Sequence, residues 1–349
     1  MVNESEKILS AFSQIYFYKE LVHDSLKFIP ENDTEKEVAD VLLNIGDIII
    51  AIQLKWRNDK DLTDDEQKEI KWLGKQCKNA KKQIKDSISF IQSGKLPVFK
   101  NKRNMDVKLN EAAKIVPLII FMNDNIKTYK TIVWKHSDEG MNVNCMSFSD
   151  FKKVCETLIT PIEIADYLEW RLDFYEKNGE VDTYIYEDEV GNIAISRPRN
   201  NEALVYQFLA VEYGISQATS IEKELLIFQD FLHKLPEHTQ FHSEDSADFE
   251  LVRFFAHFCR EEIKVFVDKL DKAINKSKKK EFAVIGNMRN VQRKYIVLFL
   301  SSQYGVCIPN ELIKKMIPVG METDIILQII TYWTNNEEYS IDFCYYKYS

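Results

Sequence analysis

The segment EVADVLLNIGDIIIAIQLKW, residues 37–56, constrains the fold more than any other part of the chain. It contains two runs of strand-forming residues, and Gly46-Asp47 between them suits a two-residue hairpin turn, because glycine accepts the positive φ that such turns require. With this turn the numbers of paired residues sum to 93, so Asp40 faces Gln53 across the two strands. Lys55 follows Gln53 by two residues and lies on the same face. The sequence therefore predicts that Asp40, Gln53 and Lys55 converge.

A lysine and a carboxylate inside apolar strands are costly to bury unless they pair or bind a ligand. An ion pair at the edge of the sheet explains Asp40 and Lys55 but gives no reason for Gln53. A divalent metal site explains all three residues. Asp40 supplies an anionic oxygen, Gln53 supplies a neutral carbonyl oxygen, and Lys55 can orient a water or stabilise charge on a phosphate. We therefore favour the metal site and keep the ion pair as the alternative.

The charge of the chain is unevenly distributed. The net charge is −9, which taken alone argues against a protein whose surface binds nucleic acid. Residues 68–103, however, contain eleven Lys and Arg and only two acids, so this window carries +9 and the remainder carries −18. A solvated helix would explain such a run by itself. Beside a cluster of converging polar residues, the same run indicates a surface for a polyanion.

The pattern of apolar residues gives a coarse map of the chain. Helical spacing predicts a helix over residues 4–28 and another over residues 63–94, which opens with an acid-rich cap. Residues 113–123 and 129–136 look like buried strands, and residues 149–177 are rich in helix. Further along, the sequence predicts a hairpin at 183–196, helices at 201–214, 221–234, 247–275 and 281–302, and an antiparallel strand pair at 323–333 and 339–348.

The predicted fold class is therefore α/β with two domains. The N-terminal domain, residues 1–178, is expected to hold a mixed sheet flanked by helices. The C-terminal domain, residues 179–349, is expected to be mainly helical and to end in a short β-hairpin. Its role is not indicated by any motif.

The N-terminal segment resembles a known family. A carboxylate on one strand and a (D/E/Q)-x-K motif on the next, between a helix that bears a glutamate and a second helix, resembles the core of the PD-(D/E)xK nuclease superfamily. This superfamily has the restriction-endonuclease-like fold. The motif Gln53-Leu54-Lys55 is similar to the glutamine variant of the Mrr-like endonucleases. The resemblance covers residues 5–95, and extends to residue 177 if the later strands complete the sheet.

The resemblance implies a site and its cofactor. It implies that Asp40 and Gln53 hold Mg²⁺ or Mn²⁺, that Lys55 assists the attacking water, and that a glutamate on the first helix supports the metal. Glu20 is the best match to that glutamate, with the rivals Glu35 and Glu37 closer in sequence.

The function implied is that of a metal-dependent endonuclease that hydrolyses DNA phosphodiester bonds. Four lysines of the basic helix are expected to contact the nucleic-acid backbone: Lys75, Lys78, Lys82 and Lys85. The chain departs from the family at Ala39, where proline is usual, and at Gln53, which removes one negative charge. The alternative is therefore a catalytically inactive nuclease fold that binds nucleic acid or protein. The choice between DNA and RNA, and a homodimeric state, are left open.

Two further features bear on location and chemistry. No apolar run approaches the about 20 residues that cross a bilayer, and the start MVNESEKILS lacks the layout of a signal peptide. No membrane partner is expected, and the cytoplasm is the expected location. The six cysteines show no CxxC spacing, which predicts reduced, mostly buried thiols.

A second basic run lies in DKAINKSKKKEF, at Lys272, Lys276 and Lys278 to Lys280. It is expected to form a turn between two helices. The sequence does not decide whether this turn contacts phosphates or is only solvated.

Overall fold

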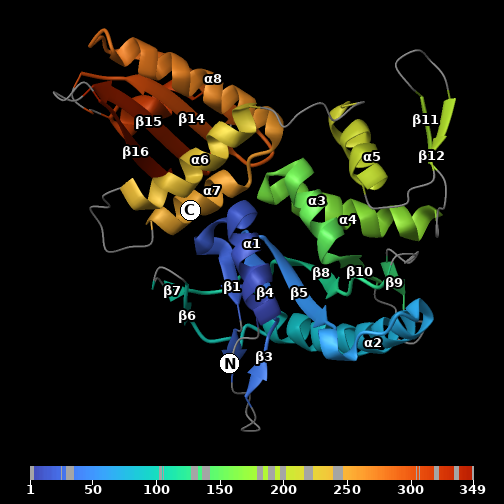
Figure 1. The fold of residues 1–349 in the computed structure, drawn as a ribbon. Coiled ribbons are helices and arrows are strands. Elements are labelled where there is room, and N and C mark those ends of the chain that lie inside the picture. The colour runs from blue at the N-terminus through green and yellow to red at the C-terminus, as the bar shows by residue number, and fades with distance from the viewer. Residues whose placement is uncertain are drawn as a thin grey trace. The chain divides into compact units, whose positions relative to one another are not determined.

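The computed structural model describes residues 4–24, 26–28, 35–101, 104, 106–126, 133–135, 142–178, 184–187, 193–196, 202–215, 223–238, 247–303, 305, 307–317, 322–333 and 338–347 (Figure 1). By its internal contacts the chain divides into two compact units. Unit 1 comprises residues 1–221 and 252–257, and unit 2 comprises residues 222–251 and 258–349. The predicted boundary near residue 178 falls inside unit 1.

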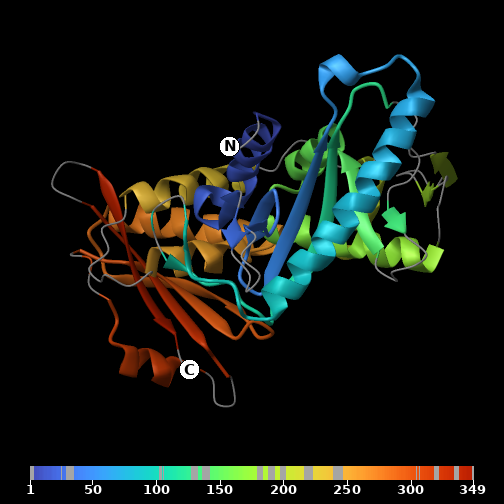
Figure 2. The ribbon, with the colours of Figure 1, turned by 90° about the horizontal axis from the view of Figure 1, so that it is seen from below.

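Unit 1 is built on a six-stranded mixed sheet with the strand order β1-β4-β5-β8-β10-β9. The strands are β1 (Val22–Asp24), β4 (Val41–Asn44), β5 (Ile48–Trp56), β8 (Lys114–Met122), β9 (Val133–Lys135) and β10 (Asn142–Ser147). The strands β1, β4 and β5 run antiparallel in turn, whereas β8 is parallel to both β5 and β10. The parallel pair β5 and β8 needs a crossover. The helix α2 (Glu66–Gln92) supplies it and runs beside both strands (Figure 2).

The hairpin between β4 and β5 has the predicted register. Leu42 pairs with Ala51 and Asn44 pairs with Ile49. Gly46 adopts a φ of 111°, in the region that favours glycine. The chemistry of the turn therefore sets which side chains of the two strands share a face.

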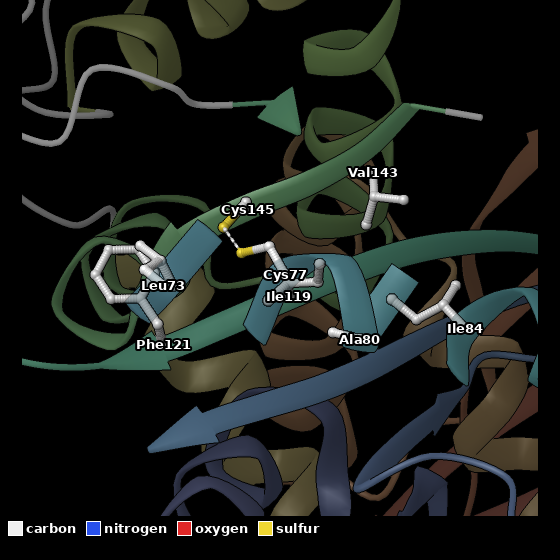
Figure 3. Close-up of a cluster of buried hydrophobic side chains, with 8 residues drawn as sticks. All are labelled: Leu73, Cys77, Ala80, Ile84, Ile119, Phe121, Val143 and Cys145. Atoms are coloured by element: carbon white, nitrogen blue, oxygen red, sulfur yellow. Dashed lines mark hydrogen bonds between the residues drawn. The ribbon is translucent and has the colours of Figure 1, made fainter. Parts of the chain in front are cut away.

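The helix α2 covers one face of this sheet. Its N-cap is Asp65, whose carboxylate accepts hydrogen bonds from the backbone N–H groups of Gln67 and Lys68 at 3.1 and 3.4 Å. Figure 3 shows the apolar cluster beneath α2, in which the Sγ atoms of Cys77 and Cys145 lie 3.6 Å apart. The cluster consists of Leu73, Cys77, Ala80, Ile84, Ile119, Phe121, Val143 and Cys145.

Other helices cover the opposite face. Asn144 precedes Cys145 in β10, so the two side chains point to opposite faces of the sheet. The Asn144 side chain donates to the carbonyl oxygen of Leu168 in α4 (Pro161–Asn178) at 2.9 Å. The helix α3 (Phe148–Leu158) packs beside it on β8 and β10, and Phe148 contacts Phe12 of α1 (Glu4–Leu21) with ring centroids 5.4 Å apart. The sheet is therefore covered on both faces.

Two predictions for unit 1 need correction. The first helix ends at Leu21 and not at residue 28, because residues 22–24 leave it and pair with β4 as strand β1. The strand β10 was not predicted, since its polar residues Asn142 and Asn144 hide an apolar pattern. Of the strand predicted at 129–136, the structure describes only β9, and the rest lies outside the described residues.

Unit 2 holds a four-stranded sheet with the order β13-β14-β15-β16. The strands are β13 (Ala283–Asn290), β14 (Tyr295–Ser301), β15 (Ile325–Trp333) and β16 (Tyr339–Lys347). The helices α6 (Lys223–His238) and α8 (Arg260–Ser277) lie on one face (Figure 1). On this face Phe266 of α8 contacts Phe299 of β14. The short helix α9 (Asn310–Met316) lies on the other face and inserts Ile313 between β14 and β15.

The C-terminal half contains more strand than predicted. Residues predicted as a helix at 281–302 form the antiparallel strands β13 and β14. The predicted helix at 247–275 is divided into α7 (Ala247–Ala256) and α8. The terminal strand pair is confirmed as β15 and β16, and it belongs to the larger sheet.

The remaining elements are short or lie apart from the two large sheets. They are β2 (Lys27–Phe28), β3 (Lys36–Glu37), the 3₁₀ helix η1 (Asp59–Asp61), β6 (Phe99–Lys100), β7 (Asp106–Val107), β11 (Tyr184–Glu187), β12 (Ile193–Ser196) and α5 (Glu202–Tyr213). The predicted hairpin is confirmed as the antiparallel pair β11 and β12, and its turn lies outside the described residues. Among the residues described, none of the helices is both long and apolar enough to cross a membrane.

The cysteines differ from the prediction at one pair. Cys307 and Cys344 form a disulfide, which joins the segment before α9 to β16. The side chain of Gln328, which pairs with Cys344 in the sheet, bonds both the N–H and the carbonyl oxygen of Ile308 at 2.8 Å. The other four cysteines are free, and three of these thiols are buried as predicted.

Candidate functional site

The structure brings Asp40, Gln53 and Lys55 together, as predicted. Lys55 Nζ lies 4.0 Å from Asp40 Oδ2 and donates to Gln53 Oε1 at 3.3 Å. Gln53 pairs with Ile119 and Lys55 pairs with Phe121 in the parallel strand β8, and both apolar partners belong to the cluster beneath α2. The three polar side chains therefore lie on the face of the sheet that α2 covers.

Asp40 stands just before β4, where the ladder with β5 becomes irregular. Its backbone N–H donates to the carbonyl oxygen of Ile52 at 3.1 Å, and its Oδ2 atom accepts from the N–H of Leu54 at 2.6 Å. The carboxylate thus replaces a backbone acceptor that the ladder lacks at this point. The ion pair with Lys55 also uses Oδ2, and Oδ1 has no hydrogen bond within the described part of the chain.

The electrostatic environment disfavours the ionised form of Asp40. Burial raises the pKa of its carboxyl above the usual value, and the negative charge of Glu6 raises it further. The charge of Lys55 and the hydrogen bond from Leu54 act in the opposite direction without cancelling this rise. The carboxylate is therefore short of compensating positive charge, and a cation beside it would lower its pKa.

Gln83 of α2 is a member of the site that the sequence analysis missed. Lys55 Nζ donates to Gln83 Oε1 at 3.0 Å, which is shorter than its bond to Gln53. Gln83 lies three residues after Ala80 and four before Ser87, and both of these residues are buried. Helical periodicity alone would have placed Gln83 at the margin of the buried face.

The role of Glu20, the predicted helical glutamate, stays a prediction; its side chain is buried in the last turn of α1. Strand β1 pairs Val22 with Leu43, which lies three residues, or about 10 Å, along β4 from Asp40. Glu20 lies in α1, two residues before β1 begins. The charge on α1 that acts on Asp40 is that of Glu6, in the first turns of the helix.

The two rival glutamates lie on a small surface ribbon. Glu35 forms an exposed ion pair with Lys27 at 2.9 Å. Glu37 faces the same lysine in the pair of short strands β2 and β3. Neither position is part of the six-stranded sheet that carries Asp40.

The basic segment forms one exposed stripe along α2. Six lysines fall within about 100° of the helical circumference and extend over about 26 Å. They are Lys68, Lys71, Lys75, Lys78, Lys82 and Lys85, and all six are exposed. Lys68 pairs with Asp65 at 3.3 Å, and the other five have no ion pair within the described residues. The four lysines predicted to contact a nucleic acid belong to this stripe, and their role stays a prediction.

The start of α2 is fixed by the fully buried carboxylate of Glu69. It accepts from Asn123 Nδ2 at 2.7 Å and from Thr63 Oγ1 at 3.0 Å, and it lies 3.1 Å from Arg57 Nε. Burial opposes its ionisation, but the hydrogen bonds and the charge of Arg57 outweigh burial and lower the pKa of Glu69. The network joins the segments after β5 and β8 to the first turn of α2.

The donor set at Asp40 suits a hard cation with few protein ligands. Among the side chains that the structure describes, no three His, Cys, Asp or Glu lie close enough together to hold a metal. Asp40 and Gln53 supply one carboxylate and one carbonyl oxygen, and Oδ1 of Asp40 has no competing hydrogen bond within the described residues. Mg²⁺ is commonly held by one or two carboxylates and keeps several waters. The residues present therefore fit this ion.

Comparison with known proteins adds no relative. No model of a protein family matches the chain, and no curated protein or solved structure shows a significant match to it. The function of the chain is therefore inferred from the geometry of the site.

Proposed function

We propose that unit 1 is a metal-dependent nuclease that hydrolyses DNA phosphodiester bonds. The observation that carries the proposal is the position of Lys55 Nζ, 4.0 Å from the Asp40 carboxylate and 3.3 Å from the Gln53 carbonyl oxygen. These side chains lie on paired strands, after a helix that bears Glu6 and before the helix α2. This order of elements supports the resemblance to the restriction-endonuclease-like fold.

Each residue has a distinct task in this proposal. Asp40 and Gln53 would hold Mg²⁺ or Mn²⁺, and Glu6 adds negative charge near them. When bound, the ion supplies positive charge for the scissile phosphate and acidifies a water. Lys55 can move a proton to or from the attacking water, or offset charge on the phosphate. Gln83 holds the Lys55 ammonium through their 3.0 Å hydrogen bond.

The lysine stripe would hold the nucleic-acid backbone beside these residues. Lys82 and Lys85 flank Gln83 on α2, so the stripe passes within two helical positions of the site. No aromatic side chain lies among the six lysines on this arc of the helix. The stripe therefore suits phosphates and not bases, and binding through it should depend little on sequence.

Three substitutions test the proposal. Asp40→Asn removes the one carboxylate ligand and should abolish cleavage, whereas Lys55→Ala should leave metal binding intact and slow cleavage by about 10²–10⁴-fold. Gln53→Glu should tighten Mg²⁺ binding and preserve or raise activity, because it adds an anionic oxygen. Metal binding is measured by calorimetry, and cleavage is measured on plasmid DNA, single-stranded DNA and RNA. The proposal is wrong if neither wild type nor Gln53→Glu binds metal and neither protein cuts any of these substrates.

One observation favours a second candidate, a catalytically inactive nucleic-acid-binding module. The Lys55 ammonium donates to two neutral oxygens, of Gln53 and Gln83, and Asp40 is the one acid within 4.0 Å of it among the described residues. In this case wild type would bind DNA equally well with and without Mg²⁺ and would cut none of the three substrates. Substitution of Asp40 would then leave DNA affinity unchanged.

A further inference from the structure

The turn that follows α8 carries an exposed group of lysines on unit 2. Lys278, Lys279 and Lys280 are all exposed, and residues 276–281 contain four lysines and one glutamate, a net charge of +3. Lys276 pairs with Glu281 at 3.2 Å. Lys279 and Lys280 have no ion pair within the described residues. The turn therefore presents uncompensated positive charge.

Aromatic rings lie at the same end of the four-stranded sheet. Trp333 closes β15 and Tyr339 opens β16, and the two residues pair directly, with ring centroids 6.5 Å apart. Lys278 Nζ lies 5.5 Å from the centroid of the Trp333 ring, so the lysine turn contacts this ring. Tyr339 is 51% exposed, and Phe282, two residues after the turn, is 61% exposed.

Two further charged residues of the described part of the chain lie beside Tyr339. Lys234 of α6 lies near enough to Tyr339 for the two groups to interact, but its charge is paired with Asp230 at 2.6 Å. Glu338 is exposed next to Tyr339 and adds one negative charge. Among the residues described, the three lysines of the turn therefore outnumber the acid beside the rings.

We infer that Trp333, Tyr339 and the turn Lys278–Lys280 form a binding surface for single-stranded nucleic acid. A single strand exposes the faces of its bases, which stack on aromatic rings, and its phosphates attract lysines. Protein surfaces that bind single strands combine aromatic rings with positive charge. A duplex exposes no free base face, so only the attraction between its phosphates and the lysines would remain. The choice of nucleic acid over an anionic membrane rests on the proposed function of unit 1. Membrane binding is one outcome of the test.

The test measures binding by the full chain in EDTA, so that no cleavage occurs. The probe is a labelled single-stranded oligothymidine of about 20 nucleotides, longer than the site of one binding module, and its affinity is read by fluorescence anisotropy. Tyr339→Ser should weaken binding at least about fivefold, which is the low end of base stacking on an aromatic residue. Tyr339→Phe keeps the ring and should bind like wild type. Neither variant should change affinity for a duplex of the same length.

The lysines are tested with a matched control. The double variant Lys279→Gln, Lys280→Gln should flatten the log–log salt dependence of single-strand binding by about 1.4, at about 0.7 for each lost phosphate contact. Lys314→Gln, Lys315→Gln removes the same charge from α9 of the same unit, where both lysines are exposed. The control should leave the slope unchanged.

Three results would overturn the inference. They are unchanged affinity in Tyr339→Ser, equal slopes in the two double variants, or no binding of the oligonucleotide by wild type. Binding to an anionic membrane is measured by sedimentation with phosphatidylserine vesicles. Loss of vesicle binding in Tyr339→Ser, with single-strand affinity retained, would assign the surface to membranes. Because these measurements exclude Mg²⁺, their failure leaves the cleavage tests of unit 1 untouched, and failure of cleavage leaves this binding result standing.

Discussion

Replacing Lys78, Lys82 and Lys85 with glutamine tests what the stripe on α2 does. Five of the six stripe lysines have no ion pair within the described residues. If each of the five contacts one phosphate of duplex DNA, the log–log dependence of affinity on salt should have a slope of about −4.5, at about 0.9 per contact. The triple variant retains two such lysines, so its slope should be about −1.8.

These slopes predict a large difference over an ordinary salt range. When salt rises from about 50 to about 200 mM, wild type should lose about 500-fold in affinity and the triple variant only about 12-fold. The three lysines are exposed on a helix, and glutamine is a good helix former. Each substitution should therefore change the free energy of unfolding by no more than about 0.5 kcal/mol. The assay is anisotropy of a labelled duplex in EDTA over a series of salt concentrations.

The control removes the same charge from elsewhere in unit 1. Lys108, Lys152 and Lys177 are exposed and lie outside α2, so their replacement by glutamine matches the loss of three charges. This control should keep the wild-type slope. Equal slopes in the two triple variants would show that net charge alone governs binding, and an unchanged slope in the α2 variant would show that the stripe is only solvated.

Two other substitutions and one chemical treatment should change the stability of the fold. Glu69→Gln leaves Arg57 without its buried partner and should lower the free energy of unfolding by about 3 kcal/mol, measured by urea denaturation, whereas exposed Glu176→Gln should change it little. Reduction of the Cys307–Cys344 disulfide, whose cysteines are 37 residues apart, should destabilise unit 2 by about 4 kcal/mol, and equal melting with and without reductant would contradict this. The pKa of Asp40 is raised on folding, so Asp40 favours the folded state below its unfolded pKa and this contribution is lost as pH rises through its folded pKa. Asp40→Asn should therefore raise the melting temperature at pH 7 relative to wild type, and the difference should shrink toward pH 3 to 4.

The core of the candidate site was predictable because it is local. Asp40, Gln53 and Lys55 lie within sixteen residues on one hairpin, and Gly46 fixes the register of that hairpin by its φ of 111°. A period of two along each strand then decides which side chains share a face. No long-range contact was needed for this step.

The residues that were missed depend on tertiary contacts. Strand β1 has three residues, which is too short for a period to be read, so its pairing with β4 could not be predicted. Gln83 reaches Lys55 only because α2 folds back over β5. The signal for Gln83 was present in the helical pattern, whereas nothing local in the sequence distinguished Glu6 from Glu20.

The wrong helix at 281–302 has a similar cause. Strand β14 is buried at every position, so it shows a continuous apolar run and no alternation. Such a run does not separate a buried helix from a central strand by period alone. Its parallel partner β15 begins thirty residues after β14 begins, and the β-branched residues Ile296 and Val297 were a local indication of a strand.

The charge balance at Lys55 has a consequence for the order of binding. Within the described residues, Asp40 is the one carboxylate within 4.0 Å of the ammonium, so a metal ion would share this anion with Lys55. Gln53 and Gln83 offer neutral oxygens, which attract a divalent ion less strongly than a carboxylate does. When Mg²⁺ has few protein ligands, substrate phosphates usually complete its coordination shell. We therefore expect the ion to bind weakly to the free protein and more tightly when the lysine stripe holds a nucleic acid. In calorimetry, the apparent affinity for Mg²⁺ should then rise in the presence of DNA for wild type, and less in the triple lysine variant. Equal Mg²⁺ affinity with and without DNA would show that the protein ligands alone define the metal site.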